Sequence, residues 1–336
     1  MSSAPTADEI ARDPTWLAQA LDPNAAKVRL VAMDRESYRC ASFLDDRLMQ
    51  RPVNAQLVPW PGVEAALGGD LRTDARWIFH IGHVGSTLVS RLLGELGGVL
   101  AIREPRLLRD LALSPAEVRE RYLPSIPKLM SRTFGESEIA CVKATSFASE
   151  IAQHLVPPGE RALFMYAAPR HYVASILAGE NSVKELHALA DHRSQRLAAR
   201  DIAPPPARHD ADRAAAAWAC EMTTLEAAAA AMPDRQVAWA DFDIILGNMP
   251  GELGRVAAFF GFAADPPKIE ALAAGPLMRR YSKDPNYDYS PTLRAELIAQ
   301  ELRLQRRDIE AALAMLRTAA EKSELLSRAL ARAEGN

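Results

Sequence analysis

The stretch of residues 77–96, WIFHIGHVGSTLVSRLLGEL, places the tightest constraint on the fold of this chain. It opens with a short apolar and aromatic run, 77–81, that is typical of a buried strand. The chain then turns at Gly82, and apolar residues recur at helical spacing from Leu88 onward, behind hydroxyl side chains that can cap the helix start. The N–H groups of such a turn and the helix dipole converge on one point, so this stretch predicts a site for a phosphate or a similar anion.

The overall composition excludes several classes of protein. The chain has 336 residues and a formal net charge of −3, from 40 basic and 43 acidic side chains, so it lacks the basic excess of a general nucleic-acid binder. Its three cysteines, Cys40, Cys141 and Cys220, are far apart and lack metal-ligand spacing, which indicates reduced thiols. No stretch reaches the apolar length of a membrane span, and the polar N-terminus carries no apolar signal region. These features predict a cytoplasmic globular protein that binds neither nucleic acid nor a metal ion.

Short buried strands alternate with helical segments along the middle of the chain. Strand patterns cover 77–81, 98–102, 139–142, 162–167 and 236–240, and helical patterns cover 15–21, 88–96, 106–113, 115–132, 147–155, 171–178, 212–231 and 252–260. Strands that alternate with helices through short connections favour a parallel sheet with helices on both faces. The predicted fold class is therefore α/β, a P-loop-like parallel β-sheet flanked by helices, with a helical C-terminal extension.

Three regions of the chain differ in character. Residues 1–70 are predicted to cover one side of the core and show no evident chemistry. Residues 71–275 form the P-loop-like core, which includes a polar flap over 180–212 whose arginines suit a solvated face or a lid. Residues 276–336 begin with an irregular, aromatic and basic segment suited to a loop that folds back over a nucleotide. One or two charged helices packed on the core are predicted to follow it.

Charged side chains follow two of the predicted strands. Glu104 comes after the second strand and Lys143 after the third. In an open parallel sheet, ligands sit outside the carboxyl ends of the strands, so both side chains are expected to face the same crevice as the glycine loop. The structural alternatives are an ion pair of Glu104 with Arg103, Arg106 or Lys143, and an ordinary exposed lysine beside a helix cap for Lys143.

The glycine loop differs from that of common nucleotide hydrolases. It lacks the lysine of an ATP-type P-loop, which argues against an ordinary kinase or ATPase. Its glycines and hydroxyls still suit one 5′-phosphate or phosphosulfate, although a plain strand-to-helix turn would show the same hexapeptide. The residues predicted to contact the anion are Gly82, His83, Val84, Gly85, Ser86 and Thr87.

The motifs around this loop occur in an order that resembles a known family. FHIGHVGSTLVSRLL is followed by IREPRLL, CVKATSF and MYAAPRHYVASIL, and then by VAWADFDIIL ahead of a helix that ends in FFGF. Over residues 77–262, this order resembles the sulfotransferases that use 3′-phosphoadenosine-5′-phosphosulfate (PAPS), a family with a P-loop-like α/β fold. The resemblance implies PAPS as the donor, without a metal. Local similarity to the tyrosylprotein-type sulfotransferases implies that Glu104 is the general base and that Lys143 is the positive charge on the transferring sulfuryl group.

Two positions depart from the pattern of that family. His83 stands where the family usually carries a lysine or arginine, so a group only partly charged near neutral pH would have to contact the 5′-phosphate. Ala167 stands eight positions before Ser175, where the family has an arginine that accompanies this serine at the 3′-phosphate. The candidates to replace that arginine are Arg170 and the late basic residues Arg279, Arg280 and Lys283.

Sulfuryl transfer is chemically consistent with these roles. An in-line displacement at sulfur needs a base for the proton of the acceptor and a cation where charge builds on the leaving oxygen. The expected function is transfer of the sulfuryl group of PAPS to a hydroxyl or amine of a small-molecule or peptide acceptor, with Glu104, Lys143 and His83 at the reacting centre. The alternatives are a nucleotide-dependent phosphotransferase and a non-catalytic interaction protein of the same fold. The acceptor and the oligomeric state stay open, a homodimer included.

Overall fold

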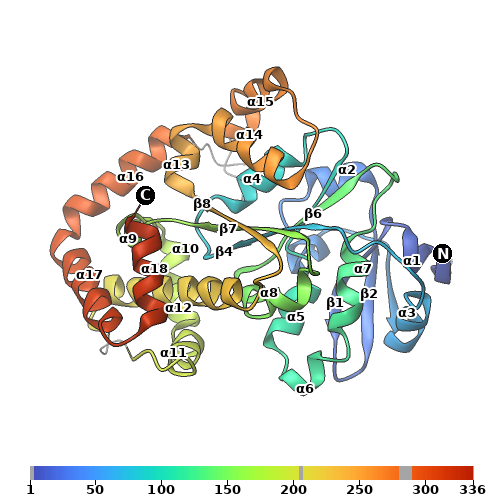
Figure 1. The fold of residues 1–336 in the computed structure, drawn as a ribbon, viewed down its shortest axis with the longest axis horizontal. Coiled ribbons are helices and arrows are strands. Elements are labelled where there is room, and N and C mark those ends of the chain that lie inside the picture. Colours follow the sequence, from blue (N-terminus) through green and yellow to red (C-terminus); the bar gives the residue numbers. More distant parts are fainter. Residues whose placement is uncertain (1–3, 204–206, 280–289, 336) are drawn as a thin grey trace.

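The computed structural model describes residues 4–203, 207–279 and 290–335. A five-stranded sheet in the order β5-β6-β4-β7-β8 forms its centre, and every neighbouring pair of strands is parallel (Figure 1). The strands are β4 (Arg76–His80), β5 (Val99–Arg103), β6 (Ile139–Lys143), β7 (Arg161–Tyr166) and β8 (Gln236–Asp241). Because β4 has a neighbour on each side and helices above and below, it has the continuous apolar sequence of a fully buried strand.

Helices cover both faces of this sheet (Figure 1). One face packs on α12 (Asp210–Ala230), with α8 (Ala152–Leu155), α9 (Pro169–Leu177) and the 3₁₀ helix η3 (Ser146–Ile151) beside it. The other face packs on α4 (Ser86–Leu93) and α14 (Met249–Phe260). The predicted α/β class, a parallel sheet flanked by helices, is confirmed.

The N-terminal region forms a separate antiparallel sheet of β1 (Trp16–Asp22), β2 (Lys27–Ala32) and β3 (Ala55–Pro59). The predicted helix over 15–21 is therefore wrong. Asp22 Oδ1 accepts hydrogen bonds from the N–H groups of Asn24 and Ala25 (3.1 and 3.0 Å), which closes a tight turn and lets β1 pair with β2. The helical segments of this region are α1 (Ala7–Arg12), α2 (Arg35–Cys40), η1 (Asp46–Gln50) and α3 (Trp60–Ala66).

The connection between β5 and β6 is divided into more and shorter helices than its apolar pattern predicts. After α5 (Arg106–Leu113), the helical pattern over 115–132 becomes α6 (Ala116–Arg119), η2 (Leu123–Ser125) and α7 (Ile126–Met130). Pro124 and Pro127 lie in the first turns of η2 and α7. Proline lacks the N–H donor that a continuous helix needs, so the segment restarts at each of them.

The polar segment after α9 is helical, and most of its described residues are exposed or half-buried. It folds into α10 (Glu180–Ala188) and α11 (Ala190–Ala198), and both contact α12. Arg193 and Arg196 are buried and pair with Glu221 of α12, with Arg196 Nη1 2.9 Å from Glu221 Oε1. For Arg193 and Arg196 the prediction of solvated arginines is therefore wrong, because these charges neutralise a buried carboxylate, whereas Arg208 is exposed.

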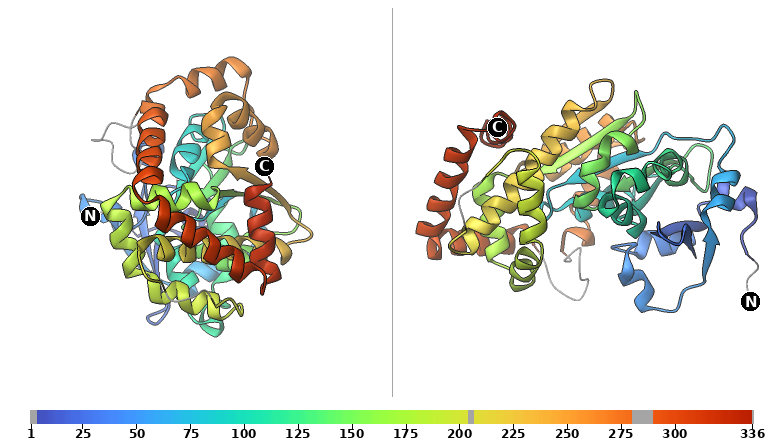
Figure 2. Two further views of the ribbon diagram at one scale, coloured as in Figure 1. Left: turned by 90° about the vertical axis from the view of Figure 1, so that its left-hand side faces the viewer. Right: turned by 90° about the horizontal axis from the view of Figure 1, so that it is seen from below.

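The C-terminal part contains α13 (Phe242–Gly247), α15 (Pro266–Ala273), η4 (Pro276–Arg279), α16 (Pro291–Leu304), α17 (Arg306–Ala320) and α18 (Glu324–Glu334). The predicted helical extension is confirmed, although it has three helices instead of one or two. Helix α16 packs on α9, and α17 and α18 pack on α12, at the end of the molecule opposite the N-terminal sheet (Figure 2). Most of the predicted nucleotide-covering loop, 280–289, lies outside the described residues. No helix within the described ranges is both long and apolar enough to cross a membrane.

Candidate functional site

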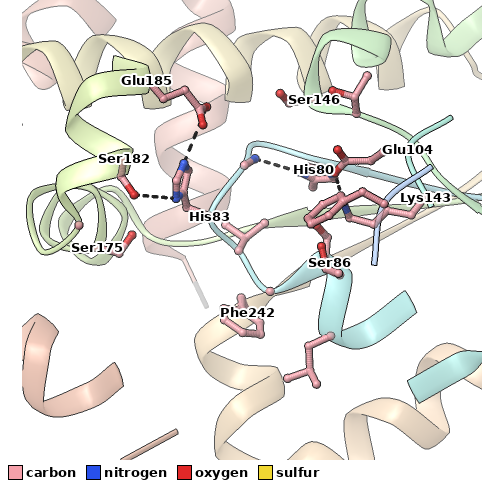
Figure 3. A pocket seen from close by; sticks show the side chains of 18 of the residues that line it. His80, His83, Ser86, Glu104, Lys143, Ser146, Ser175, Ser182, Glu185 and Phe242 are labelled. Atoms are coloured by element: carbon pink, nitrogen blue, oxygen red, sulfur yellow. Dashed lines mark hydrogen bonds and ion pairs between the residues drawn. The ribbon is translucent and has the colours of Figure 1, made fainter. Parts of the chain in front are cut away.

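A cavity of about 710 Å³ lies at the carboxyl ends of β4, β5 and β6 (Figure 3). It is lined by the loop after β4, by the residues that follow β5 and β6, by one side of α9 and α10, and by Phe242 and the start of α16. Ligands of open parallel sheets bind at this edge, and the volume lies within the range of roughly 300–1,000 Å³ that is usual for small-molecule sites. The structure therefore brings the glycine loop, Glu104, Lys143 and Ser175 to one cavity.

The loop between β4 and α4 has an unusual backbone. Gly82, His83 and Gly85 have φ values of 79°, 55° and 60°, all in the left-handed region. Gly85 is the N-cap of α4 and no described side chain caps this helix, so the N–H groups of its first turn are left for solvent or a ligand. Left-handed residues ahead of a helix make a concave group of N–H donors. The backbone of this loop is therefore of the kind that binds anions, and anion binding itself stays a prediction.

Substituting Gly85 by alanine is expected to destabilise the protein by roughly 2–4 kcal/mol, from the strain of a left-handed alanine and from overpacking. A Cβ atom at Gly85 would lie 1.9 Å from two ring carbons of Phe242, a buried side chain. Urea unfolding measures the loss. The matched control is Gly82→Ala, which has the same kind of positive φ but no described atom within 4 Å of the new Cβ. Equal losses in the two variants would contradict the close contact with Phe242.

Glu104 and Lys143 form an ion pair at the floor of the cavity (Figure 3). The Lys143 Nζ contacts Glu104 Oε1, and the lysine side chain is only 1 % exposed. Arg47 approaches the other carboxylate oxygen, with its Nη2 3.9 Å from Oε2. Glu104 also has a positive φ of 53°, a conformation that costs a non-glycine residue about 1–3 kcal/mol. The ion pair is the structural alternative that the sequence left open for Glu104.

The surroundings of Glu104 decide its protonation state. Burial raises the pKa of this carboxyl, but the charge of Lys143 and the hydrogen bond from His80 outweigh it and hold the pKa well below its ordinary value. Glu104 is therefore ionised at neutral pH. As long as the ion pair is intact, such a carboxylate is a weak base.

His80 connects the loop to Glu104. Its Nδ1 accepts a hydrogen bond from the Gly82 N–H (2.9 Å), so the ring hydrogen is on Nε2, which lies 3.5 Å from Glu104 Oε1. The side chain is buried, and no role at the site was predicted for it from the sequence. The sequence feature that could have indicated a role at the site is the position of His80, a polar residue at the end of the strand before the loop.

His83 lies on the opposite side of the loop, against α10. Its Nδ1 is 3.4 Å from the Ser182 hydroxyl and its Nε2 is 3.9 Å from a Glu185 carboxylate oxygen, and the ring points toward both side chains in Figure 3. The ring also packs edge-on against Tyr172. These contacts fix His83 in the wall that joins the loop to α10.

The predicted site for a second phosphate is only partly assembled. Ser175 lines the cavity, where its hydroxyl donates to the Tyr172 carbonyl (2.9 Å). Arg170 does not reach the cavity formed by the described residues, since its Nη2 binds Glu310 of α17 at 2.7 Å on the surface. Ala167 is buried, and its carbonyl accepts a hydrogen bond from Trp218 (2.9 Å).

Of the late basic residues, the structure describes Arg279 alone. Arg279 is exposed on η4 and does not line the cavity that the structure describes. Arg280 and Lys283 lie outside the described residues.

A cation that the sequence did not predict lines the cavity instead. Arg294 of α16 binds Asp243, with its Nη1 2.6 Å from Oδ1, and its guanidinium lies 4.9 Å from the centre of the Phe242 ring. His171 binds the second oxygen of Asp243 at 2.7 Å. Because Arg294 and Asp243 are far apart in the sequence, no local pattern could have indicated their pairing.

The N-terminal region supplies the wall beside Glu104. Phe43, Asp45, Asp46 and Arg47 line the cavity, and the Arg47 guanidinium stacks 3.3 Å from the centre of the Phe43 ring. Residues 1–70, where the sequence shows no evident chemistry, therefore form part of the cavity wall. This segment follows α2, which packs on the edge strand β5, so the chain passes close to the carboxyl end of that strand.

Three solved structures are similar to this chain. The sulfotransferase domain from the curacin biosynthetic pathway has a TM-score of 0.40 and 11% identity, covering 66% of this chain and 85% of that one. The sulfotransferase domain of the Synechococcus PCC 7002 olefin synthase has a TM-score of 0.38 and 12% identity, with coverage of 69% and 96%. A sulfotransferase from Alicyclobacillus acidocaldarius has a TM-score of 0.35 and 15% identity, with coverage of 70% and 94%.

No protein-family model matches the sequence, and a search of curated proteins finds no match. A likeness of this degree does not assign chemistry, so the function has to be inferred from the residues of this chain.

Proposed function

We propose that this chain transfers the sulfuryl group of PAPS to a hydroxyl or amine acceptor. The observation that carries the proposal is the meeting of a carboxylate and a buried lysine, Glu104 and Lys143, beside a left-handed glycine loop in one cavity. Sulfuryl transfer needs a base, a cation and an anion cradle, and Glu104, Lys143 and the loop are the candidates for these three roles. The cytoplasmic location and the division of the chain at residues 70 and 275 stay predictions.

The loop over 82–87 would hold the 5′-phosphosulfate of the donor. Its uncapped helix start and positive φ values supply N–H donors, and Ser86 and Thr87 supply hydroxyls at the first helical positions. His83 and Ser175 line the same cavity. His83 stays a predicted contact of the 5′-phosphate, and Ser175 stays a predicted contact of the 3′-phosphate.

The ion pair between Glu104 and Lys143 would have to open during the reaction. The acceptor oxygen or nitrogen forms a bond to sulfur, the bond from sulfur to the bridging phosphate oxygen breaks, and the acceptor proton passes to the Glu104 carboxylate. Lys143 stabilises the charge on the leaving oxygen, so it must turn from Glu104 toward the donor. That movement removes the interaction that lowers the Glu104 pKa most, and the carboxylate becomes a stronger base when the donor is in place.

His80 would keep the carboxylate in position during this exchange. Its Nδ1 is held by the Gly82 N–H, and its Nε2–H group stays directed at Glu104 when Lys143 has moved. The base is thereby aligned with the same loop that binds the donor.

Calorimetry with 3′-phosphoadenosine-5′-phosphate, the desulfated donor, tests the proposal. We expect a dissociation constant between about 1 µM and 1 mM, the usual range for enzyme substrates, and no binding of adenosine alone at the same concentrations. Failure to bind at millimolar ligand would exclude PAPS as the donor and favour a non-catalytic protein of this fold. Transfer from ATP that depends on Mg²⁺ would favour the phosphotransferase instead.

A further inference from the structure

Arg294 carries a buried hydrogen-bond donor that has no acceptor among the described residues. Its Nη1 binds Asp243 at 2.6 Å, whereas its Nη2 is shielded from solvent and unpaired. The side chain is only 15 % exposed. An arginine stays protonated in a protein, so this N–H donor is not lost by deprotonation. A buried, charged and unsatisfied donor at a cavity wall indicates a missing anionic partner.

Arg294 shares its carboxylate partner with a second group that can carry positive charge. Asp243 is shared between Arg294 and His171, whose Nδ1 lies 2.7 Å from Oδ2. The hydrogen bond to Asp243 raises the pKa of His171 above its ordinary value, which favours the imidazolium form. Burial raises the pKa of the Asp243 carboxyl, but His171 and Arg294 outweigh it and keep the carboxyl ionised.

A second carboxyl, that of Asp241, also belongs to this cluster. Asp241 accepts a hydrogen bond from the Asp243 N–H (2.7 Å), and burial raises its pKa. Arg294 and His171 are therefore paired with the carboxylates of Asp243 and Asp241, while the unpaired Nη2 belongs to Arg294, the member of this cluster that lines the cavity.

Arg294 is within reach of a ligand bound to the glycine loop. Its guanidinium lies over the Phe242 ring, and the same ring packs against Gly85 of the loop. Helix α16, which carries Arg294, packs on α9, which carries Ser175, and all four residues line one cavity. One small molecule can therefore contact the loop through one anionic group and Arg294 through another.

We propose that Arg294, held in place by Asp243 and accompanied by Ser175, forms a second anion subsite of this cavity that binds a phosphate-type group. This inference rests on the proposed function, because it names the part of the donor site that Ala167 leaves without a cation. The phosphate can come from two sources, the second phosphate of the donor nucleotide or an anionic acceptor. Because the Phe242 ring contacts both Arg294 and Gly85 of the loop, the second phosphate of the donor is the favoured source.

Calorimetry on Arg294→Gln tests the subsite and its source. We expect 3′-phosphoadenosine-5′-phosphate to bind about 10- to 100-fold more weakly, the effect of losing one charged hydrogen bond, and adenosine 5′-monophosphate to bind with unchanged affinity. Arg303→Gln, an exposed arginine on the same helix, is the matched control and should change neither affinity. Arg294→Lys should restore part of the loss, because it returns the charge without the planar donor pair.

The second source gives a different result. If an anionic acceptor occupies the subsite, both nucleotides keep their affinity for Arg294→Gln, and inorganic phosphate binds to the nucleotide-saturated wild type but not to the saturated variant. Unchanged nucleotide affinities together with unchanged phosphate binding would overturn the subsite. An equal loss for both nucleotides would overturn it too, since it marks a general structural role.

The subsite can be tested even if the proposed function fails. Should the wild type bind neither nucleotide, PAPS is excluded as the donor, and inorganic phosphate is titrated against the free protein. Weaker phosphate binding by Arg294→Gln than by Arg303→Gln supports the subsite, and equal binding overturns it.

Discussion

Replacing Glu104 by glutamine is expected to slow sulfuryl transfer by about 10²- to 10⁴-fold, the usual contribution of a general base. Glutamine has nearly the same shape but cannot take up the proton of the acceptor. The affinity for 3′-phosphoadenosine-5′-phosphate should change by less than about threefold, because the donor is bound by the loop and not by this side chain. Release of the desulfated nucleotide from PAPS, measured with phenol, alcohol and amine acceptors, gives the rate, and calorimetry gives the affinity.

The matched control for this variant is Glu117→Gln, which changes an exposed glutamate on α6 and should leave both quantities unaltered. A parallel fall of rate and affinity would mark Glu104 as a structural residue. An unchanged rate would remove it from the mechanism.

Replacing Lys143 by methionine is expected to destabilise the folded protein by about 3 kcal/mol, the cost of leaving one charge of a buried ion pair without its partner. Methionine preserves most of the volume, so the loss comes mainly from the unpaired Glu104 carboxylate. In the double variant Glu104→Gln with Lys143→Met, both charges are gone, and most of the stability should return. Urea unfolding of the four proteins, the wild type included, gives the coupling free energy directly.

The pH dependence of this stability has a definite sign. The folded pKa of Glu104 lies below the ordinary value of 4.5, so the ion pair contributes fully above that pH and is lost as the pH falls through the folded pKa. The deficit of Lys143→Met should therefore be larger at pH 7 than at pH 3.5.

The control for this pair is Lys184→Met, which breaks the exposed pair with Glu180 and should cost less than about 0.5 kcal/mol. A double variant as unstable as Lys143→Met alone would show that the loss does not arise from the unpaired carboxylate.

The parts of the fold that the sequence predicted are those with a strong local signal. The strand over 77–81 has the continuous apolar run of a central parallel strand, and the glycines after it mark the loop. Glu104 and Lys143 were placed by a rule that needs only the order of strands and the direction of the sheet. Local pattern and topology were sufficient for these residues.

The features that the sequence missed depend on contacts between distant segments. β1 is a strand because it pairs with β2, although residues 15–21 also fit a helix. Arg193 and Arg196 are buried because Glu221 of another helix lies beside them. In each case a partner outside the segment decided the outcome, the next strand for β1 and another helix for the two arginines.

The arginine proposed to bind the second phosphate also could not be predicted from local sequence. Arg170 is close in sequence to Ser175 and looked suitable, but α17 supplies Glu310 and holds it on the surface. Arg294 is far from the motifs and reaches the cavity only because α16 packs on α9. Proximity along the chain was a poor guide to proximity in space.

The wall made by residues 43–47 has a consequence for how such a protein can diversify. These residues lie between β2 and β3 in the chain, whereas the glycine loop follows β4 of the central sheet. On the proposed function, substitutions in 43–47 would reshape the space next to the base while the donor loop keeps its backbone. Descendants of this chain could thus exchange one acceptor for another by changing a short surface segment, without rebuilding the machinery that holds the donor.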